Sequence, residues 1–272
     1  MTGVRELLVP LDGTAETLPA LRVAGSIAAL TAADVSAVIV CSPHADPGPD
    51  LAWLEEQSRR AGLTLRRRVV SPGLDVPAGV LAAANEPGTV LCLSSHGRSG
   101  LAEMVLGSDS NEIVRRTTSP VLLVGPEARP ARRFEKLMVC LDGSPLSEQA
   151  LAVAADLAAD LHLSLHLVRV VDSDGIAPSD LDDDDQLRRA VSDLEGRGLE
   201  ADWQILCSLP EARTLVRHAD EAEVDLVVVG THGRSGMRAV TMGSVANAVV
   251  RHAHQPVLVV PAGPHRPAGR PG

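Results

Sequence analysis

The sequence predicts an α/β fold made of two tandem copies of one unit, each a parallel sheet covered by helices on both faces. Three observations lead to this prediction. Short apolar runs alternate with amphipathic runs along the chain, as strands and helices do in βαβ units. Blocks of sequence occur twice in the same order. The chain is 45% hydrophobic but only 1% aromatic, so its core consists of Ala, Val and Leu, which suits helices packed on a buried parallel sheet.

The repeated blocks define the domain organisation. VPLDG at 9–13 returns as VCLDG at 139–143, 130 residues later. HGRSG at 96–100 returns at 232–236, and PVLLV at 120–124 returns as PVLVV at 256–260, both 136 residues later. Solenoid repeats recur every 20 to 50 residues or so, so this longer period indicates duplicated domains. We expect domains at 1–128 and 134–261, a linker at 129–133 and a disordered Pro/Gly-rich tail at 262–272.

The order of apolar and amphipathic runs is the same in both copies. In the first copy we expect strands at 6–11, 35–41, 65–70, 90–94 and 120–124, and helices at 16–30, 50–61, 77–84 and 108–117. In the second copy we expect strands at 136–141, 164–171, 201–207, 225–230 and 256–260, and helices at 146–159, 185–196, 211–222 and 244–252.

The change of offset from 130 to 136 places a net insertion of six residues in the middle of the second copy. The acidic run DLDDDD at 180–185 lies in this stretch. We interpret it as a solvated loop leading into a helix N-terminus, where negative charge is favourable, with a metal site as the alternative.

Composition and charge exclude several classes of function. The net charge of −10 and the lack of stacking aromatics argue against nucleic-acid binding, and the short Arg clusters at 66–68 and 132–133 are interpreted as solvated surface or linker. No apolar run reaches the roughly 18 residues of a membrane helix, and the N-terminus lacks the pattern of a signal peptide. The cysteines lie far apart in apolar strand-like runs, which predicts buried free thiols (Cys41, Cys92, Cys140, Cys207). We therefore expect a cytoplasmic protein.

Two loops of the second copy have the chemistry of an anion site. In a doubly wound sheet, ligands bind beyond the carboxyl ends of the strands. Asp142 follows the first strand, and glycines follow the fourth strand at Gly230, Gly233 and Gly236. Glycines let backbone N–H groups approach phosphate oxygens, Arg234 adds a charged contact, and Gly243-Ser244 opens a helix whose dipole favours negative charge. Asp142 can bind a ribose, a base or a magnesium ion. A plain turn and helix cap remains the alternative for Asp142-Gly143-Ser144.

Other phosphate and catalytic loops are absent from the sequence. The single lysine, Lys136, lies outside any Walker motif, no G-x-G-x-x-G follows the first strand, and no G-x-S-x-G occurs. The histidines at 96, 232, 252 and 254 lack metal-ligand neighbours, and we interpret them as cap or surface residues.

The motif G-x2-G-x9-G-[ST] after the fourth strand, with V-x-L-D-G after the first and P-V-L-V-V as the fifth, resembles the universal stress protein family, twice, as in its tandem members. The resemblance implies an adenine-nucleotide alpha-hydrolase-like fold with doubly wound five-stranded parallel sheets in the order 3-2-1-4-5. It also implies that the two copies pack as a pseudo-dimer, that two chains form a homodimer, and that ATP lies between the loops after the first and fourth strands. The implied ATP contacts in the second copy are Asp142 and Val170 on the adenine side, and Gly230, Gly233, Arg234, Ser235, Gly236, Gly243, Ser244 and Val245 on the phosphate side.

The first copy departs from this pattern. Ser94 replaces the first glycine, and Asp109 places a carboxylate beside the helix-opening serine, where it repels phosphate by about 1–4 kcal/mol at roughly 4 Å. Magnesium could reverse that effect. The corresponding ATP contacts are Asp12, Val40, Gly97, Arg98, Gly100, Gly107 and Ser108. We expect the second copy to be the main nucleotide site and the first to be a weaker or metal-dependent one.

Three hypotheses for function follow. The first is an ATP-binding stress-response regulator, without catalytic residues, in which the nucleotide acts as a conformational ligand on an unidentified protein partner. The second is a slow ATPase or phosphotransferase that uses Asp142 and Mg²⁺. The third is a dimeric interaction scaffold that binds no nucleotide.

Overall fold

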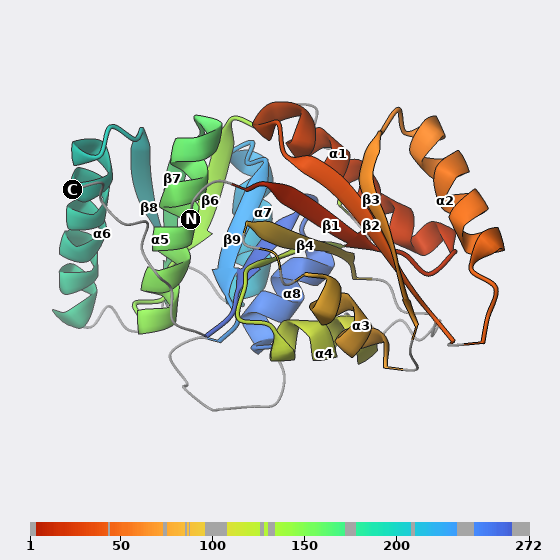
Figure 1. Ribbon diagram of the computed structural model, residues 1–272. Coiled ribbons are helices and arrows are strands. Elements are labelled where there is room, and N and C mark those ends of the chain that lie inside the picture. The colour runs from red at the N-terminus through yellow and green to blue at the C-terminus, as the bar shows by residue number, and fades with distance from the viewer. Residues whose placement is uncertain are drawn as a thin grey trace.

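The computed structural model describes residues 4–42, 44–72, 75–84, 86, 88–95, 108–125, 128–129, 134–171, 178–207, 210–232 and 242–262, with backbone alone for 67–72 and 178–184. Strands and helices alternate along these residues (Figure 1). The first half contains β1 (Glu6–Pro10), the 3-10 helix η1 (Ala15–Thr17), α1 (Leu18–Thr31), β2 (Asp34–Cys41), α2 (Gly48–Arg60), β3 (Leu65–Pro72), α3 (Val76–Ala83), β4 (Thr89–Ser94), α4 (Ser108–Arg116) and β5 (Val121–Val124). The second contains β6 (Lys136–Cys140), α5 (Pro145–Leu161), β7 (Ser164–Val171), α6 (Pro178–Gly196), β8 (Ala201–Cys207), α7 (Glu211–Glu221), β9 (Leu226–Gly230), α8 (Ser244–His252) and β10 (Val257–Val260).

The strands form one 10-stranded sheet in the order β3-β2-β1-β4-β5-β10-β9-β6-β7-β8. Read from its outer edge inwards, each half has the order 3-2-1-4-5, and neighbouring strands within a half are parallel. The predicted α/β fold class is therefore confirmed. The domain boundaries at 128 and 134 stay predictions.

The two halves meet through their fifth strands, which the sequence placed in separate sheets. β5 and β10 pair antiparallel, with Leu122 opposite Leu258 and Val121 opposite Val259. Both strands are fully buried runs of Val and Leu, and an exposed apolar edge of this kind is a site of aggregation. Each edge covers the other, so that two predicted five-stranded sheets become one continuous sheet.

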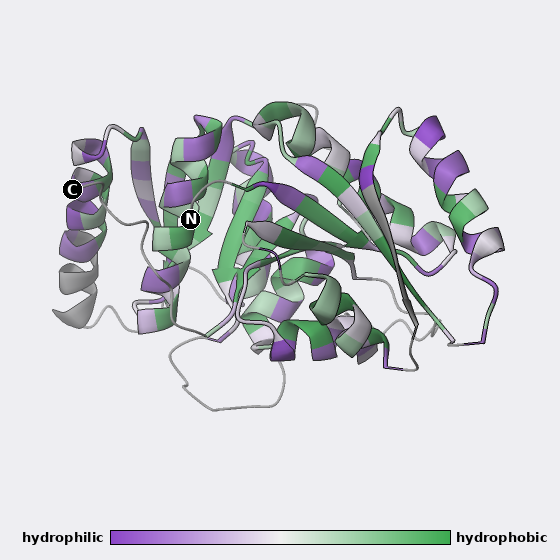
Figure 2. Cartoon of the chain, in the orientation of Figure 1, coloured by the Kyte–Doolittle hydropathy of each residue, from purple (hydrophilic) through white to green (hydrophobic). Residues whose placement is uncertain are grey.

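The alternation of side chains along the strands creates one hydrophobic cluster on each face of the sheet. In β6, Leu137 and Val139 join the cluster under α1, α2, α5 and α6, whereas Met138 joins the cluster under α3, α4, α7 and α8. Hydrophobic residues fill the central strands, and the outer helices α2 and α6 carry many hydrophilic residues (Figure 2). Both faces are thus covered, as the near-continuous apolar strands predict.

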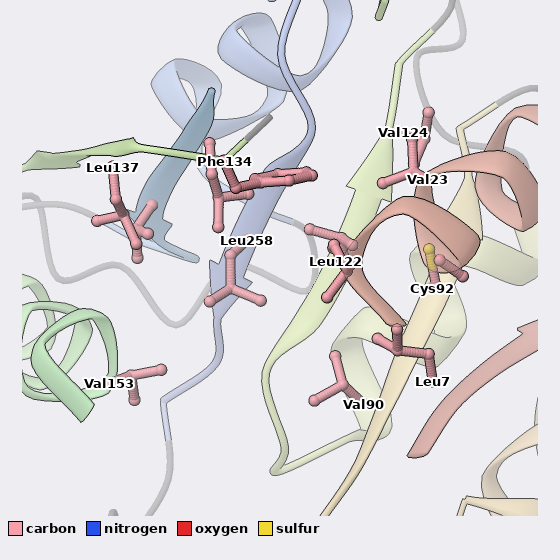
Figure 3. Packing of buried hydrophobic residues seen from close by; sticks show 14 of the residues in the cluster. Leu7, Val23, Val90, Cys92, Leu122, Val124, Phe134, Leu137, Val153 and Leu258 are labelled. Carbon is pink, nitrogen blue, oxygen red and sulfur yellow. The ribbon is translucent and has the colours of Figure 1, made fainter. Parts of the chain in front are cut away.

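The seam between the halves is packed with apolar side chains from both copies. Leu7, Val90 and Leu122 of the first half face Phe134 and Leu258 of the second (Figure 3). A small apolar cavity of about 40 Å³ remains among them. Among the described residues, no helix is both long and apolar enough to cross a membrane.

Two expectations from the sequence are wrong. The acidic run 180–185 lies inside α6, which begins at Pro178, and is not a loop. Proline suits the first turn of a helix, and the dipole favours acidic residues there, so the run extends the helix towards its N-terminus. The thiols are not uniformly buried either, because Cys207, at the end of the edge strand β8, is exposed and only Cys92 is fully buried. The other elements have the predicted bounds or differ from them by one or two residues at their ends.

Candidate functional site

The loop after β6 forms a turn that also caps α5. Gly143 has a φ of +77°, and the Asp142 carboxylate accepts a hydrogen bond from the backbone N–H of Ser144 at 3.0 Å. The Ser144 hydroxyl in turn accepts from the backbone N–H of Ser147 at 3.2 Å. The cap that the sequence left as an alternative is therefore present. Asp142 is half-buried and its position is set by this turn.

The loop after β9 is tied back to the sheet at both ends. The backbone N–H of Thr231 donates to the carbonyl of Val260 at 2.9 Å, and the carbonyl of Thr231 accepts from the N–H of Gly243 at 2.7 Å. The chain therefore leaves the sheet and returns to it at the same point. Gly233, Arg234, Ser235 and Gly236 lie outside the described residues.

Gly230, the last residue of β9, has α5 directly above it. A Cβ added at this position would lie 3.0 Å from Cγ of Leu146. A larger residue would have to displace Leu146, which explains why glycine stands at this position in the second half.

The N-cap residue of α8 provides no side-chain cap. Gly243 occupies this position, and the first turn carries no acidic residue. The first N–H groups of a helix have no partner within the helix, and the dipole adds partial positive charge. This helix start is therefore suited to bind an anion, whereas the N-termini of α3 and α5 are capped by Asp75 and Ser144.

These elements enclose a cavity of about 330 Å³ at the carboxyl ends of β6, β7 and β9. It joins six of the predicted residues, namely Asp142, Val170, Gly230, Gly243, Ser244 and Val245. Val168, Val170 and Leu215 give one side of the lining an apolar character, and Thr231, Ser244 and the helix start give the other side a polar one. An apolar wall for a flat ring and a polar end for an anion are typical of a small-molecule site.

Several lining residues were not predicted. Val168 lies two residues before Val170 on the same face of β7, so strand alternation could have indicated it. Glu211 and Leu215 come from α7, and no sequence signal showed that this helix forms a wall. His232, interpreted as a cap or surface residue, also lines the cavity, with Nδ1 3.1 Å from the Thr231 hydroxyl. Cys140 lines it as a neutral thiol, because desolvation raises its pKa to about 12.

The first half has the same turn after its first strand but differs at the end of its fourth. The Asp12 carboxylate accepts hydrogen bonds from the backbone N–H and the hydroxyl of Thr14, at 3.0 and 2.6 Å. Ser94 is buried, and its hydroxyl accepts from the N–H of Ala20 at 3.1 Å and donates to the carbonyl of Thr17 at 3.2 Å. A side chain hydrogen-bonded to the start of α1 thus stands where the second half has Gly230.

The remaining predicted residues of the first half are only partly described. Val40 lies near the end of β2, and Ser108 opens α4 with Asp109 in its first turn. Gly97, Arg98, Gly100 and Gly107 lie outside the described residues. In the part of the chain that the structure describes, no group of three or more His, Cys, Asp or Glu side chains is arranged to hold a metal ion.

The fold is thus a doubly wound sheet, repeated and joined edge to edge, with a cavity at the strand ends of the second half, and it places the chain in the α/β class. The sequence model of the universal stress protein family matches residues 3–125 and 133–261. The chain belongs to the universal stress protein family, and it contains the family domain twice.

Relatives and solved structures agree with this assignment. A universal stress protein of Mycobacterium tuberculosis is 34% identical over 202 residues, which cover 67% of this chain and 65% of that protein, just under two thirds of its length. One from Mycolicibacterium smegmatis is 28% identical over 283 residues, covering 93% of this chain and 96% of that protein. The crystal structure of a universal stress protein from Archaeoglobus fulgidus has the same fold, with a TM-score of 0.70 at 20% identity over 96% of this chain and 99% of that one.

Proposed function

We propose that the second half binds ATP in the cavity at the ends of β6, β7 and β9, and that the nucleotide acts as a conformational ligand in a stress-response regulator. The observation that carries the proposal is the start of α8. Its N-cap residue is a glycine, which has no side chain to cap the helix, and Gly243, Ser244 and Val245 line a cavity that has an apolar opposite side. A phosphate group satisfies such a helix start, and an adenine ring suits such a wall.

Each part of the nucleotide has a proposed place. The adenine ring lies against Val168, Val170 and Leu215, and Asp142 accepts hydrogen bonds from the ribose. The phosphates lie on the α8 N-terminus, and the loop residues Gly230, Gly233, Arg234, Ser235 and Gly236 complete the contacts. Mg²⁺ accompanies ATP as its counterion, since the described residues provide no separate metal site.

We propose that the first half acts mainly as a structural partner of the second. Ser94 fills the position of the missing glycine, and Asp109 places a negative charge in the first turn of α4. Both features oppose a phosphate group at that helix start. We therefore expect one tightly bound nucleotide per chain.

A transplanted acid tests the proposed phosphate site. Asp109 of the first half corresponds to Val245 of the second, so Val245→Asp gives the second half the acid of the first. The new carboxylate lies at the helix start, where it favours the helix but repels phosphate by about 1–4 kcal/mol, which is roughly a fivefold to several-hundredfold loss of affinity. Calorimetry with Mg-ATP measures this loss.

The reciprocal variant is the matched control. Asp109→Val removes the acid from the first half, outside the residues that line the proposed site, and leaves the affinity of the second half unchanged. If Val245→Asp bound Mg-ATP as tightly as the wild type, or if the wild type bound none, the proposed site would be refuted. A second bound nucleotide in the wild type would contradict the proposed difference between the halves.

We do not propose turnover as the main activity, and a phosphate-release assay tests this choice. The described cavity residues include no lysine, and Asp142 is assigned to the ribose and not to the phosphates. Wild type and Asp142→Ala should therefore release phosphate from Mg-ATP at the same background rate. A faster wild-type rate that the substitution removed would favour slow hydrolysis.

A further inference from the structure

Two buried histidines meet between β7 and α7. His166 on β7 is 7% exposed and His218 on α7 is 8% exposed. Their Nε2 atoms lie 2.7 Å apart, with ring centroids 5.0 Å apart and ring planes inclined by 32°. At this distance one Nε2 atom must carry the hydrogen and the other must accept it.

Asp202 on β8 determines which nitrogen of His166 is protonated. Its carboxylate lies against Nδ1 of His166. A carboxylate only accepts, so His166 carries its hydrogen on Nδ1 and offers a bare Nε2 to His218. Asp202, His166 and His218 therefore form a hydrogen-bonded chain from the exposed edge of the sheet into the core under α7.

The histidine pair lies in the joint that also forms one side of the nucleotide cavity. Val168 and Val170 line the cavity, and His166 is the preceding residue on the same face of β7. Glu211 and Leu215 line it from α7, and His218 follows Leu215 by three residues, on the same side of the helix. A change in the distance between α7 and β7 at the pair therefore moves the apolar wall of the cavity.

The elements packed against the pair contribute both charged and uncharged groups. Asp202 of β8 and Glu221 of α7 favour protonation of His218, and Arg217 of α7 opposes it. β6 contributes the uncharged Met138 opposite His166. α8 contributes apolar residues to the same cluster and carries its charges, Arg251 and His252, in its last turn, while Asp220 of α7 contacts His254.

Burial, followed by the neighbouring His166, lowers the pKa of His218 below that of an exposed histidine. The hydrogen bond between the two Nε2 atoms forms when both histidines are neutral. It also forms when the pair carries one extra proton, because one Nε2 atom can still accept. With two extra protons both Nε2 atoms carry hydrogen, no acceptor remains, and two positive charges face each other beneath α7.

We propose that the His166–His218 pair is a proton-sensitive latch, which holds α7 against β7 at neutral pH and releases it in acid, so that nucleotide affinity falls with pH. The inference rests on the proposed function, because it concerns regulation of that same cavity. By linkage, a bound nucleotide makes the pair harder to protonate. The latch belongs to the second half alone, since Ser36 takes the place of His166 in the first half and donates to buried Glu6 at 2.5 Å.

The test compares the pH dependence of nucleotide binding in the wild type and in His218→Gln. Glutamine can donate to or accept from His166 and stays neutral, so it keeps the contact and removes the second charge. Mg-ATP affinity is measured by calorimetry at about pH 7.5 and about pH 5.5. Mg-ATP and all other groups of the chain are the same in both proteins, so only the difference between the two profiles reports the latch.

Between the two pH values, we expect the affinity of the wild type for Mg-ATP to decrease by a factor roughly five times larger than the factor for His218→Gln. The matched control is His162→Asn, an exposed histidine at the end of α5 with a φ of +55°, a conformation that asparagine tolerates. This variant keeps the wild-type profile. Identical profiles for wild type and His218→Gln would overturn the latch, while binding at pH 7.5 would leave the proposed function intact. No binding to wild type at pH 7.5 would refute both.

A second measurement needs no variant. The hydrogen shared by the two Nε2 atoms is buried and gives a proton resonance far downfield that exposed histidines do not show. We expect this signal at neutral pH, its loss on acidification, and a shift of that loss to lower pH when Mg-ATP is added. A midpoint that Mg-ATP leaves unchanged would also overturn the latch.

Discussion

The residue that ends the fourth strand of each half determines how that strand end packs against the neighbouring helix. In the second half this residue is Gly230, and its lack of a side chain leaves Leu146 undisturbed. In the first half it is Ser94, which hydrogen bonds to the start of α1 through Ala20 and Thr17. The two strand ends are thus held to the helix above them in different ways, by close packing in one half and by hydrogen bonds in the other. The sequence showed the replacement, but only the structure shows the hydrogen bonds that the serine makes.

Replacing Ser94 with alanine should destabilise the protein by about 1–3 kcal/mol. The N–H of Ala20 lies in the first turn of α1, where no carbonyl of the helix can accept its hydrogen bond, and the N-cap residue Thr17 provides no side-chain cap. Ser94→Ala therefore leaves a buried donor unsatisfied. Urea unfolding measures the loss. Ser26→Ala, which removes a hydroxyl bonded within α1, should change stability by less than about 0.5 kcal/mol, and equal losses in the two variants would refute this explanation.

The thiols should differ strongly in reactivity. The thiolate is the reactive form, and desolvation raises the pKa of Cys92 and of Cys140 to about 12. Cys207 is exposed at the end of β8. Brief treatment of the native protein with iodoacetamide near neutral pH should modify Cys207 and leave Cys92 and Cys140 unmodified, as peptide mass spectrometry would show. In denaturant all four should react, and native labelling of Cys92 would contradict its burial.

At the scale of single elements, local patterns predicted most of the fold. β7, β8 and α8 have the predicted bounds because alternation, turn residues and the Gly-Ser helix start are all local signals. The start of α6 was missed because a run of aspartates is equally common in loops and in first helical turns. The wall formed by α7 was missed for a different reason. Its contact with β7 joins residues 166 and 218, and no pattern within either segment encodes which segments meet.

The attachment of α7 predicts how stability depends on pH. The pKa of His218 is lower in the folded protein than its ordinary value, so the unfolded chain binds protons more readily. Stability is therefore full above the ordinary histidine pKa and is lost as pH falls from there towards the lower folded pKa, by about 1.4 kcal/mol for each unit of difference. Urea unfolding across this range should show a steeper loss for the wild type than for His218→Gln. Parallel curves would mean that the pair has no net effect on stability.

At the scale of the whole molecule, the seam makes one sheet out of two domains. Val121, Leu123, Val257 and Val259 are all fully buried there, and burying each such side chain contributes about 1.5–3 kcal/mol. The apolar edge strands, which the sequence suggested as surfaces for association, pair with each other within the chain. A homodimer, which stays a prediction, must therefore use another surface. The antiparallel junction also makes the proposed nucleotide cavity of the second half part of one 10-stranded sheet.

A close approach between the halves lies just beyond β5, and it gives the last prediction. A Cβ added to Gly125 would lie 2.2 Å from the backbone carbonyl oxygen of Val250 in α8. Backbone atoms cannot move aside as a side chain can, so the new methyl group of Gly125→Ala must push α8 away from the seam. The free energy of unfolding should decrease by about 1–3 kcal/mol. Urea unfolding should show a lower midpoint. Gly196→Ala is the control, because a Cβ there meets nothing within 4 Å, and its stability should stay the same or rise slightly.

Because Gly125 belongs to the first half and α8 forms the proposed phosphate site, Gly125→Ala should also weaken Mg-ATP binding in the second half. Unchanged stability and affinity would show that the two halves are coupled more loosely than this contact requires.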